Sequence, residues 1–280
     1  MHRFPIGVII DSFKTDTFEA IKLASKIGAE GIQMYGSRGN NSPYNLKGEK
    51  IKELLDFVKS NGLKFSAICG DLGRGFDKAE ENPELIEQSK RIMDMALRLE
   101  TNIVTTHIGV IPNDKTSDKY KIMQDACFRL SEYADSLNAH FAIETGPETS
   151  LVLKEFLDSL NSTGVAVNLD PANMVMITGE DPVNSVYNLK DYIVHTHAKD
   201  GIKLLDIEPE VLYGEIEKEI QNALAFKEMP LGYGKVNFKE YLNELDNIGY
   251  RGFLTIEREC GEDPQKDIEA AVEFLNNIIN

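Results

Sequence analysis

Two hydrophobic patterns alternate along the chain from one end to the other. Short apolar runs, typical of buried strands, are separated by segments such as 17–28 and 49–62, whose apolar positions recur at i, i+3, i+4 and i+7 as in amphipathic helices. Eight strands are expected, at residues 6–10, 31–34, 64–69, 103–107, 140–144, 165–170, 192–197 and 252–257. Since strands that alternate with helices pair in parallel through right-handed crossovers, eight such units predict a closed (β/α)₈ barrel rather than an open sheet.

Residues that begin and end helices stand between these segments. An Asn-Pro or Asp-Pro pair, the sequence of an N-cap followed by proline at the first helical position, occurs at 82–83, 181–182 and 263–264. Glycines that tolerate a positive φ stand where helices are expected to end, shortly before strands; they are Gly28, Gly62 and Gly249. These residues support the alternation of helices and strands.

One connection is longer than the others. Residues 200–236 separate the seventh strand from its helix and contain an acidic stretch, 207–226, that we expect to be helical. An insertion at the carboxyl end of a barrel often forms a lid or an oligomer contact, although elaboration without a catalytic role fits the same pattern. We therefore expect a single TIM-barrel domain over residues 1–280, with about 200–236 as an inserted lid or interface segment that would permit a homo-oligomer.

Composition excludes several classes of protein. The length of 280 residues is close to the ~250 of a single α/β barrel, and the net charge of −16 argues against a nucleic-acid partner, which requires a basic surface. No run approaches the roughly 20 apolar residues of a membrane span, and the apolar run near the N-terminus is too short for a signal peptide. The three cysteines form no CxxC pair, so no disulfide framework or thiolate zinc site is indicated. We expect a cytoplasmic protein without a membrane partner.

Four of the expected strands end in a side chain that can bind a metal ion. These side chains are Glu144, Asp170, His197 and Glu257. Because side chains two residues apart share one face of a strand, all four lie on the small or polar face, opposite the apolar face that suits a covering layer of helices. The carboxyl ends of barrel strands meet at one mouth, so the four side chains are expected to converge there.

Three carboxylates and one imidazole form a ligand set for a divalent cation. Oxygen ligands with one nitrogen suit Mn²⁺, Mg²⁺ or Co²⁺, and Zn²⁺ accepts the same donors. A single acid at a strand end is more often a helix cap or a surface charge. Three carboxylates close together, however, cannot all stay ionised without a cation between them. The pattern therefore predicts one divalent metal ion, Mn, Co, Mg or Zn, held by the four side chains.

Other polar residues near the same strand ends are candidates for contact with a substrate. His107 closes the fourth strand, and it either contacts substrate or orients a base, or makes only structural hydrogen bonds. Asn173 and Lys199 are placed to contact a bound oxyanion or hydroxyl, with an ion pair to a neighbouring acid as the equal alternative for Lys199. His195 is expected one layer deeper, as a partner of a ligand or a core histidine. The glycine-rich segment 70–75 matches no phosphate-binding motif, so a flexible loop is favoured there.

These residues resemble the sugar phosphate isomerase/epimerase family, the xylose isomerase-like TIM barrels that include ketose 3-epimerases, inosose dehydratases and endonuclease IV. The resemblance covers essentially the whole chain and is carried by the segments 143–145, 168–173, 195–200, 231–238 and 255–259. It is specific for the superfamily and does not name a substrate. The chain differs from free-ketose epimerases at Asn173, where they usually have a histidine, and at Lys203, where they have an arginine.

The resemblance implies a mechanism. In similar epimerases the metal ion holds adjacent oxygens of a keto sugar. If the same roles apply here, Glu144 and Glu257 would flank the substrate as the catalytic residues. One would remove a proton beside the carbonyl and the other would return it through an enediolate, while Asp170 and His197 would act only as ligands. The implied activity is isomerisation or epimerisation of a small keto sugar or sugar derivative.

Two alternatives to an isomerase remain. A lyase would dehydrate an inosose or a keto-sugar derivative by the same proton abstraction, and a non-catalytic barrel would keep the metal site for ligand binding or structure. The endonuclease branch is disfavoured, because it binds three zinc ions through many histidines and this chain has five histidines and a charge of −16.

Overall fold

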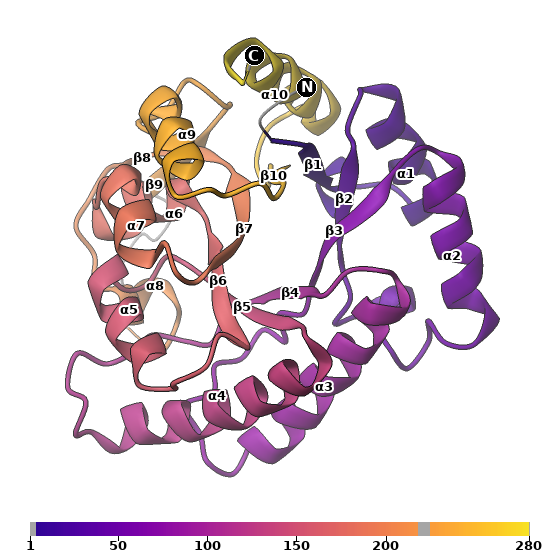
Figure 1. Ribbon diagram of the computed structural model, residues 1–280. Coiled ribbons are helices and arrows are strands. Elements are labelled where there is room, and N and C mark those ends of the chain that lie inside the picture. The colour runs from indigo at the N-terminus through magenta and orange to yellow at the C-terminus, as the bar shows by residue number, and fades with distance from the viewer. Residues whose placement is uncertain (1–3, 218–224, 280) are drawn as a thin grey trace.

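The computed structural model describes residues 4–217 and 225–279. Eight parallel strands close into a barrel in the order β1-β10-β7-β6-β5-β4-β3-β2, which confirms the predicted (β/α)₈ fold (Figure 1). Their bounds are β1 (Ile6–Ile9), β2 (Gly31–Tyr35), β3 (Lys64–Cys69), β4 (Ile103–Thr106), β5 (His140–Glu144), β6 (Val165–Leu169), β7 (Ile193–Ala198) and β10 (Leu254–Ile256). Each strand lies within two residues of its expected bounds.

Helices surround the barrel, as Figure 1 shows. The longer ones are α1 (Thr17–Lys26), α2 (Glu49–Ser60), α3 (Asn82–Arg98), α4 (Asp118–Leu137), α5 (Ser150–Asp158), α7 (Pro182–Leu189), α9 (Phe238–Asn247) and α10 (Pro264–Ile278). Shorter turns are η1 (Ile10–Phe13), η2 (Gly39–Asn41), α6 (Pro171–Asn173), η3 (Met174–Thr178) and α8 (Pro209–Leu212). No helix in the described residues is both long and apolar enough to cross a membrane.

The two faces of the strands differ as their alternation predicts. On the outward face, side chains such as Phe141, Ile143 and Leu169 are fully buried against the helices. The inward face is polar, and it is equally buried. The inward residues below the mouth include Gln33, Thr105, Asn168, His195 and Thr255. The barrel interior is therefore a hydrogen-bonded layer rather than a hydrocarbon core.

Most of the predicted helix ends are confirmed. Gly28, Gly62 and Gly249 have φ of 85°, 75° and 80°, and Asp181 and Asp263 cap α7 and α10 through their side chains. The predicted N-cap at 82 is wrong. Helix α3 begins at residue 82 itself, because the amides of residues 84 and 85 bond to the carbonyl of residue 81, and the Asn82 side chain donates to Phe76 O at 3.0 Å instead.

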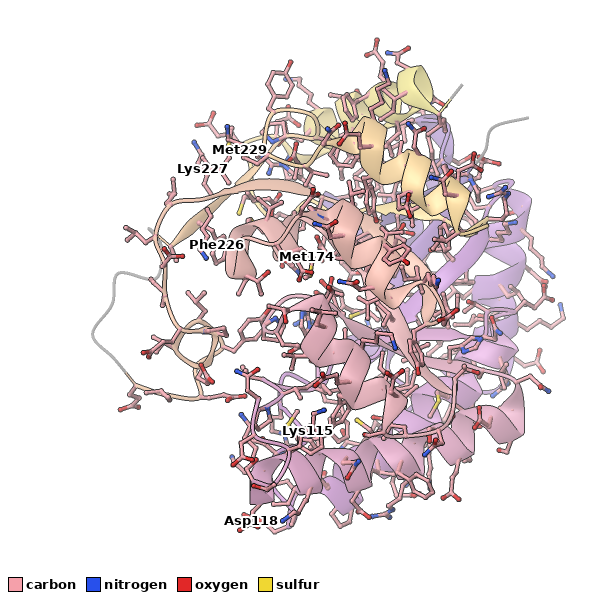
Figure 2. All side chains as sticks on the ribbon, turned by 60° about the vertical axis from the view of Figure 1, so that its left-hand side comes forward. Lys115, Asp118, Met174, Phe226, Lys227 and Met229 are labelled. Carbon is pink, nitrogen blue, oxygen red and sulfur yellow. The ribbon has the colours of Figure 1, made fainter. Side chains whose placement is uncertain are left out.

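The long connection after β7 forms a two-stranded antiparallel sheet. β8 (Asp200–Lys203) pairs with β9 (Phe226–Met229), and both lie beside η3, with Met174, Phe226 and Met229 labelled in Figure 2. The expected helix over 207–226 is confirmed only over α8 and is wrong at Phe226, since α8 ends at residue 212, before Gly214 with φ +73°, and Phe226 begins β9. Residues 218–224 of that stretch lie outside the described residues.

The base of this connection is fastened by one carboxylate. Asp200 accepts hydrogen bonds from the amides of residues 201 and 236 with Oδ1, at 2.8 and 3.1 Å, and from those of residues 232 and 234 with Oδ2, at 3.0 and 2.8 Å. A Cβ at Gly234 would lie 2.0 Å from Asp200 Oδ1, so the close approach requires glycine there. The insertion therefore leaves and rejoins the barrel at a fixed place beside the mouth.

Candidate functional site

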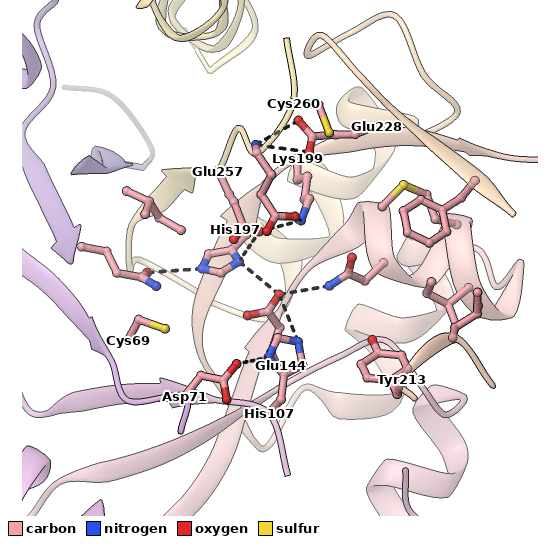
Figure 3. A pocket seen from close by; sticks show the side chains of 18 of the residues that line it. Cys69, Asp71, His107, Glu144, His197, Lys199, Tyr213, Glu228, Glu257 and Cys260 are labelled. Atoms are coloured by element: carbon pink, nitrogen blue, oxygen red, sulfur yellow. Dashed lines mark hydrogen bonds and ion pairs between the residues drawn. The ribbon is translucent and has the colours of Figure 1, made fainter. Parts of the chain in front are cut away.

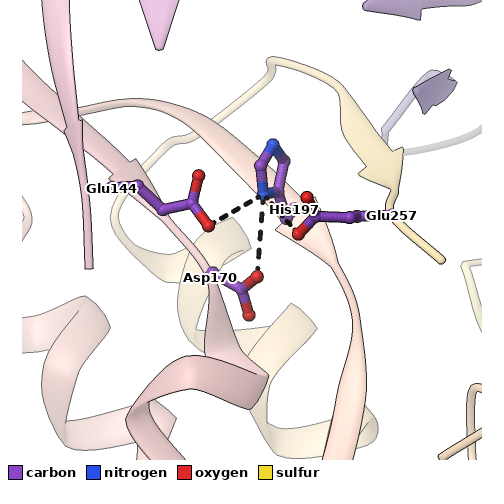
Figure 4. Close-up of side chains that lie close together, drawn as sticks. All are labelled: Glu144, Asp170, His197 and Glu257. Carbon is purple, nitrogen blue, oxygen red and sulfur yellow. Dashed lines mark ion pairs between the residues drawn. The ribbon is translucent and has the colours of Figure 1, made fainter. Parts of the chain in front are cut away.

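Four side chains from the ends of four strands meet at the mouth of the barrel. Glu144 ends β5, His197 lies in β7, and Asp170 and Glu257 directly follow β6 and β10. One ligand atom of each lies within 4.8 Å of the others, and all four residues are buried (Figure 4). The structure thus brings together the predicted ligand set, hereafter the metal-site cluster; that it binds a metal ion stays a prediction.

The His197 ring presents one nitrogen to the three carboxylates. Nδ1 lies 3.6 Å from Glu144 Oε1, 3.6 Å from Asp170 Oδ2 and 3.3 Å from Glu257 Oε2. On the other side Nε2 lies 3.2 Å from the acceptor Gln33 Oε1 and 3.2 Å from Asn168 Nδ2, which donates to Glu144 Oε2 at 3.3 Å. A proton assigned to Nε2 by the bond to Gln33 leaves the lone pair of Nδ1 facing the carboxylates, as a metal ligand requires.

Asp170 divides its two oxygens between the fold and the cluster. Oδ1 accepts from the amides of Ala172 and Asn173, at 2.8 and 3.0 Å, and so caps α6. Oδ2 is fully buried and has no hydrogen-bond partner in the described structure, while it faces the cluster. A buried anionic oxygen without a partner is costly, and a divalent cation in the cluster would satisfy it. The donor set therefore fits a metal ion.

The charges of the cluster require a positive centre. Burial alone would lower the pKa of His197, but the carboxylates of Glu144 and Glu257 hold that pKa well above its ordinary value. Burial raises the pKa of Asp170, and the other two carboxylates raise it further. Three buried carboxylates therefore favour either an imidazolium or, with twice the charge, a divalent cation among them.

A chain of hydrogen bonds supports the cluster from below. His195 Nδ1 lies 2.8 Å from Asn168 Oδ1, and His195 Nε2 lies 3.0 Å from Thr255 Oγ1. Burial holds the pKa of His195 well below its ordinary value, so the ring is neutral. Of the two expectations for His195, both apply: it is a satisfied core histidine, and through Asn168 it orients Glu144.

A cavity of about 310 Å³ opens above the cluster (Figure 3). This volume is near the lower end of the roughly 300–1,000 Å³ typical of ligand sites. Apolar and aromatic side chains form one part of its wall, namely Ile9, Tyr35, Met176, Ile177, Leu212, Tyr213 and Phe226. Polar side chains form the rest, including Gln33, Asp71, His107, Asn173, Lys199, Glu228 and Glu259. A small polar ligand with an apolar face fits this lining.

The three residues expected to contact substrate all line this cavity. His107 Nδ1 lies 3.3 Å from Asp71 Oδ2, and Nε2 lies 3.8 Å from Glu144 Oε1. Asn173 Nδ2 donates to Glu144 Oε1 at 3.0 Å, so it also positions the glutamate. That these residues contact a substrate stays a prediction.

Lys199 makes the ion pair that was the alternative to substrate contact. Its Nζ donates to Glu257 Oε2 at 2.9 Å and to Glu259 Oε2 at 2.8 Å, and it lies 4.0 Å from Asp170 Oδ2. The ammonium is buried. The lysine therefore joins the metal-site cluster to the rim of the cavity.

Sequence patterns missed the cavity residues that come from loops. Asp71 belongs to the glycine-rich segment 70–75, whose amides are partly used within the chain, with Gly73 N donating to Asp71 Oδ1 at 2.8 Å. Tyr213 comes from the insertion, and its ring lies 6.1 Å from that of His107. The position of Asp71 just after a strand was a usable signal. Tyr213 had none, because its place depends on the path of a long loop.

Comparison with known proteins gives the fold a context. The family model described as xylose isomerase-like TIM barrel matches residues 21–278. The 3-dehydroshikimate dehydratase of Bacillus anthracis is 23% identical over 272 residues, which cover 92% of this chain and 91% of that protein. The crystal structure of a xylose isomerase domain protein from Planctomyces limnophilus matches with a TM-score of 0.79 and 25% identity, over 98% of this chain and 96% of that one.

Another similar solved structure is of a protein named for a different activity. The 3-keto-D-glucoside 4-epimerase of E. coli matches with a TM-score of 0.72 and 14% identity, over 99% of this chain and 100% of that one. At this identity the likeness concerns the fold alone. The same barrel therefore serves proteins named for epimerisation and for dehydration.

Proposed function

Because the chain belongs to the xylose isomerase-like TIM barrel family, we propose that it binds one divalent metal ion and isomerises or epimerises a small keto sugar or sugar derivative. The observation that carries this proposal is the buried metal-site cluster at the floor of the cavity, in which Asp170 Oδ2 has no hydrogen-bond partner in the described structure. Glu144, Asp170, His197 and Glu257 would hold the ion, which would be Mn, Co, Mg or Zn. When bound, it would polarise a substrate carbonyl and acidify the neighbouring C–H group.

Proton transfer is assigned to the two glutamates. Glu144 comes from β5 and Glu257 follows β10, so they reach the cavity floor from strands that are not neighbours. Asn173 fixes the carboxylate of Glu144, and Lys199 fixes that of Glu257 at 2.9 Å. One carboxylate removes a proton beside the carbonyl and the other returns one to the opposite face, which inverts the carbon. His107, Asn173 and Lys199 would contact the substrate hydroxyls.

The insertion is proposed as a lid over this chemistry. Leu212, Tyr213 and Phe226 of the insertion line the cavity. Glu215 Oε1 accepts from Val110 N at 2.8 Å, and its other oxygen pairs with Lys119 on α4, so the insertion is fastened across the mouth. Such a cover would exclude water from the reacting carbon.

A dehydratase is the second candidate. The similarity to the 3-dehydroshikimate dehydratase over 92% of this chain favours it, since elimination of water begins with the same proton abstraction. His107, which is paired with Asp71, is placed in the cavity wall where it could protonate a departing hydroxyl. A product lighter by one water would distinguish this candidate from an isomerase.

Deuterium exchange tests the proposal and separates it from a non-catalytic barrel. The protein, reconstituted with Mn²⁺, is incubated in D₂O with a panel of free keto sugars, keto-sugar phosphates, an inosose and 3-dehydroshikimate, and exchange of carbon-bound protons is followed by NMR. We expect exchange with at least one compound, and its loss in Glu257→Gln assayed at a Mn²⁺ concentration that saturates the variant. Full exchange in Glu257→Gln would refute the role of this glutamate. Exchange with no compound would favour the non-catalytic barrel.

A matched control is available on the outer surface. Glu132→Gln makes the same chemical change at an exposed position of α4, outside the cavity lining. It should exchange at the rate of the unaltered protein. A parallel loss in both variants would indicate a general effect of charge rather than a role for Glu257.

A further inference from the structure

Every cation in the described lining of the cavity is already paired with carboxylates. Lys199 Nζ lies between Glu257 and Glu259, at 2.9 and 2.8 Å. His107 lies between Asp71 and Glu144, and the remaining cation, His197, faces the carboxylates of the metal-site cluster. An anionic group on a ligand would therefore have to displace a carboxylate before it could bind one of these side chains.

The lining beyond the metal-site cluster is acidic. Asp71, Glu228 and Glu259 project carboxylates into the cavity wall. Glu228 accepts from Arg258, a cation outside the lining whose Nε also donates to Asp267 Oδ2 at 2.9 Å. Three carboxylates of the cluster already balance a divalent ion, so a bound metal leaves no excess of positive charge. A phosphate or carboxylate would meet like charge on several sides.

The rest of the wall suits an uncharged polyol. Tyr213, Phe226 and Met176 offer an apolar surface of the kind that packs against the C–H groups of a sugar ring. The carboxylates and the Asn173 amide opposite them can accept and donate hydrogen bonds to hydroxyl groups. The cavity volume of about 310 Å³ limits the occupant to a small molecule.

Three cations outside the cavity lining do not change this balance of charge. A second hollow shares Asp71, His107 and Tyr213 with the cavity wall, but its Arg74 and Lys78 both pair with Glu81, each at 3.1 Å. Arg38 is exposed and does not line the cavity; its guanidinium stacks on the Tyr35 ring, 4.1 Å from the centroid. An anion site at Arg38 would be a separate way to bind a charged ligand, and Arg38→Ala tests it.

We propose that this cavity selects uncharged polyhydroxy ketones and disfavours phosphorylated sugars and carboxylates. The ligand class is a free keto sugar, a keto glycoside or an inosose, recognised through hydroxyl groups on the acidic wall and C–H groups on the aromatic wall. This inference rests on the proposed function, because it names the substrate class of the same site. It also weakens the case for 3-dehydroshikimate, which is a carboxylate at neutral pH, as the ligand of this chain.

Calorimetric binding to the Mn²⁺-loaded protein tests the inference independently of turnover. The probes are D-fructose, D-psicose and scyllo-inosose, set against D-fructose 6-phosphate, D-psicose 6-phosphate and 3-dehydroshikimate. We expect at least one neutral probe to bind about tenfold or more tightly than every anionic probe, since like-charge contacts are strongly unfavourable. An anionic probe that binds more tightly than all neutral ones would overturn the proposal, and so would failure of every neutral probe to bind.

Variants identify the cause of the selectivity. Glu259→Gln removes one wall carboxylate and one of the two closest ion pairs of Lys199. The ratio of affinities for neutral and anionic probes should therefore fall by roughly threefold. The change is modest because Glu259 is largely exposed. Glu132→Gln, with the same change in net charge, should leave the preference unaltered. An equal narrowing in both variants would contradict a local origin. Arg38→Ala should not lower the affinity for any anionic probe. A lower affinity for an anionic probe in this variant would place an anion site at Arg38.

Deuterium exchange distinguishes failure of this inference from failure of the proposed function. If a phosphorylated sugar binds best and exchanges its carbon-bound proton, the proposed function stands and the proposed selectivity is wrong. If a neutral probe binds best but shows no exchange, the proposed selectivity stands and the proposed proton transfer is wrong.

Discussion

The two halves of the barrel mouth are built differently. In the half formed by β5, β6, β7 and β10, the four predicted ligands lie in a strand or directly follow one, and they form the metal-site cluster. In the half formed by β1 to β4, Gln33 lies in β2 and His107 directly follows β4, but Asp71 lies two residues beyond β3, in the glycine-rich segment. The predicted metal ligands are thus held by the barrel strands or directly beside them, and part of the predicted substrate contacts comes from loops.

The difference has a physical basis. Strand residues are held by backbone hydrogen bonds to neighbouring strands, and the two ligands that follow strands are held similarly, since Asp170 N donates to Thr145 Oγ1 at 2.9 Å and Glu257 N to Ala198 O at 3.2 Å. Their side chains are therefore placed within the narrow limits that a metal ion requires. A loop residue is placed by fewer contacts, such as the 3.3 Å contact between His107 and Asp71. Loops can therefore vary to suit a ligand without disturbing the metal site. Substitutions in each half should have separable effects.

The largest effect is expected for Asp170→Asn. The amide keeps an oxygen for the cap of α6 but removes the charge of Oδ2, the oxygen without a hydrogen bond. Mn²⁺ affinity measured by calorimetry should fall by roughly a hundredfold or more, since loss of a direct ligand should exceed the 10- to 100-fold typical of a residue that only orients a ligand. In the metal-free protein the same change relieves repulsion, so urea unfolding should show equal or higher stability. Unchanged Mn²⁺ affinity would remove Asp170 from the ligand set.

An intermediate effect is expected for Gln33→Ala, which lies in the opposite half but touches a ligand. Gln33 Oε1 accepts from His197 Nε2 at 3.2 Å and so keeps the other nitrogen free. Mn²⁺ affinity should fall by about 10- to 100-fold. Thr105→Val, which removes only the 3.1 Å bond to the Gln33 amide, should lower it by about threefold. An effect of Thr105→Val as large as that of Gln33→Ala would point to a packing defect instead.

The smallest effect on the metal site is expected for Asp71→Asn. Asp71 touches His107 and no member of the metal-site cluster in the described contacts, so Mn²⁺ affinity should not change. Turnover of whichever compound shows exchange should fall, by about tenfold in kcat/KM, because His107 loses its charged partner. Reduced metal affinity in this variant would contradict the separation of the two halves.

The same contrast explains what could be predicted from the sequence. Glu144, Asp170, His197 and Glu257 were predicted because the two-residue period of a strand fixes which face a side chain takes, and closure of the barrel brings strand ends together. The alternation of apolar runs was sufficient for the eight strands.

The remainder depended on tertiary contacts that no short pattern encodes. Tyr213 reaches the cavity because the insertion is fastened at its base by Asp200 and across the mouth by Glu215. The expected helix over 207–226 forms only at α8 for a similar reason: composition favoured a helix, but Gly214 ends the α8 turn and pairing of Phe226 with Lys203 makes a strand. In both places long-range hydrogen bonds override local preference.

The most direct test of the central claim is the metal content of the purified protein beside a Glu144→Ala/Asp170→Ala double variant, with Glu132→Ala as the surface control. We expect about one Mn, Co, Zn or Mg per chain in the unaltered protein and in the control, and none in the double variant. Equal metal content in the double variant would place the ion elsewhere. If the unaltered protein binds no divalent ion even after reconstitution, the metal-dependent proton transfer proposed for this barrel is wrong.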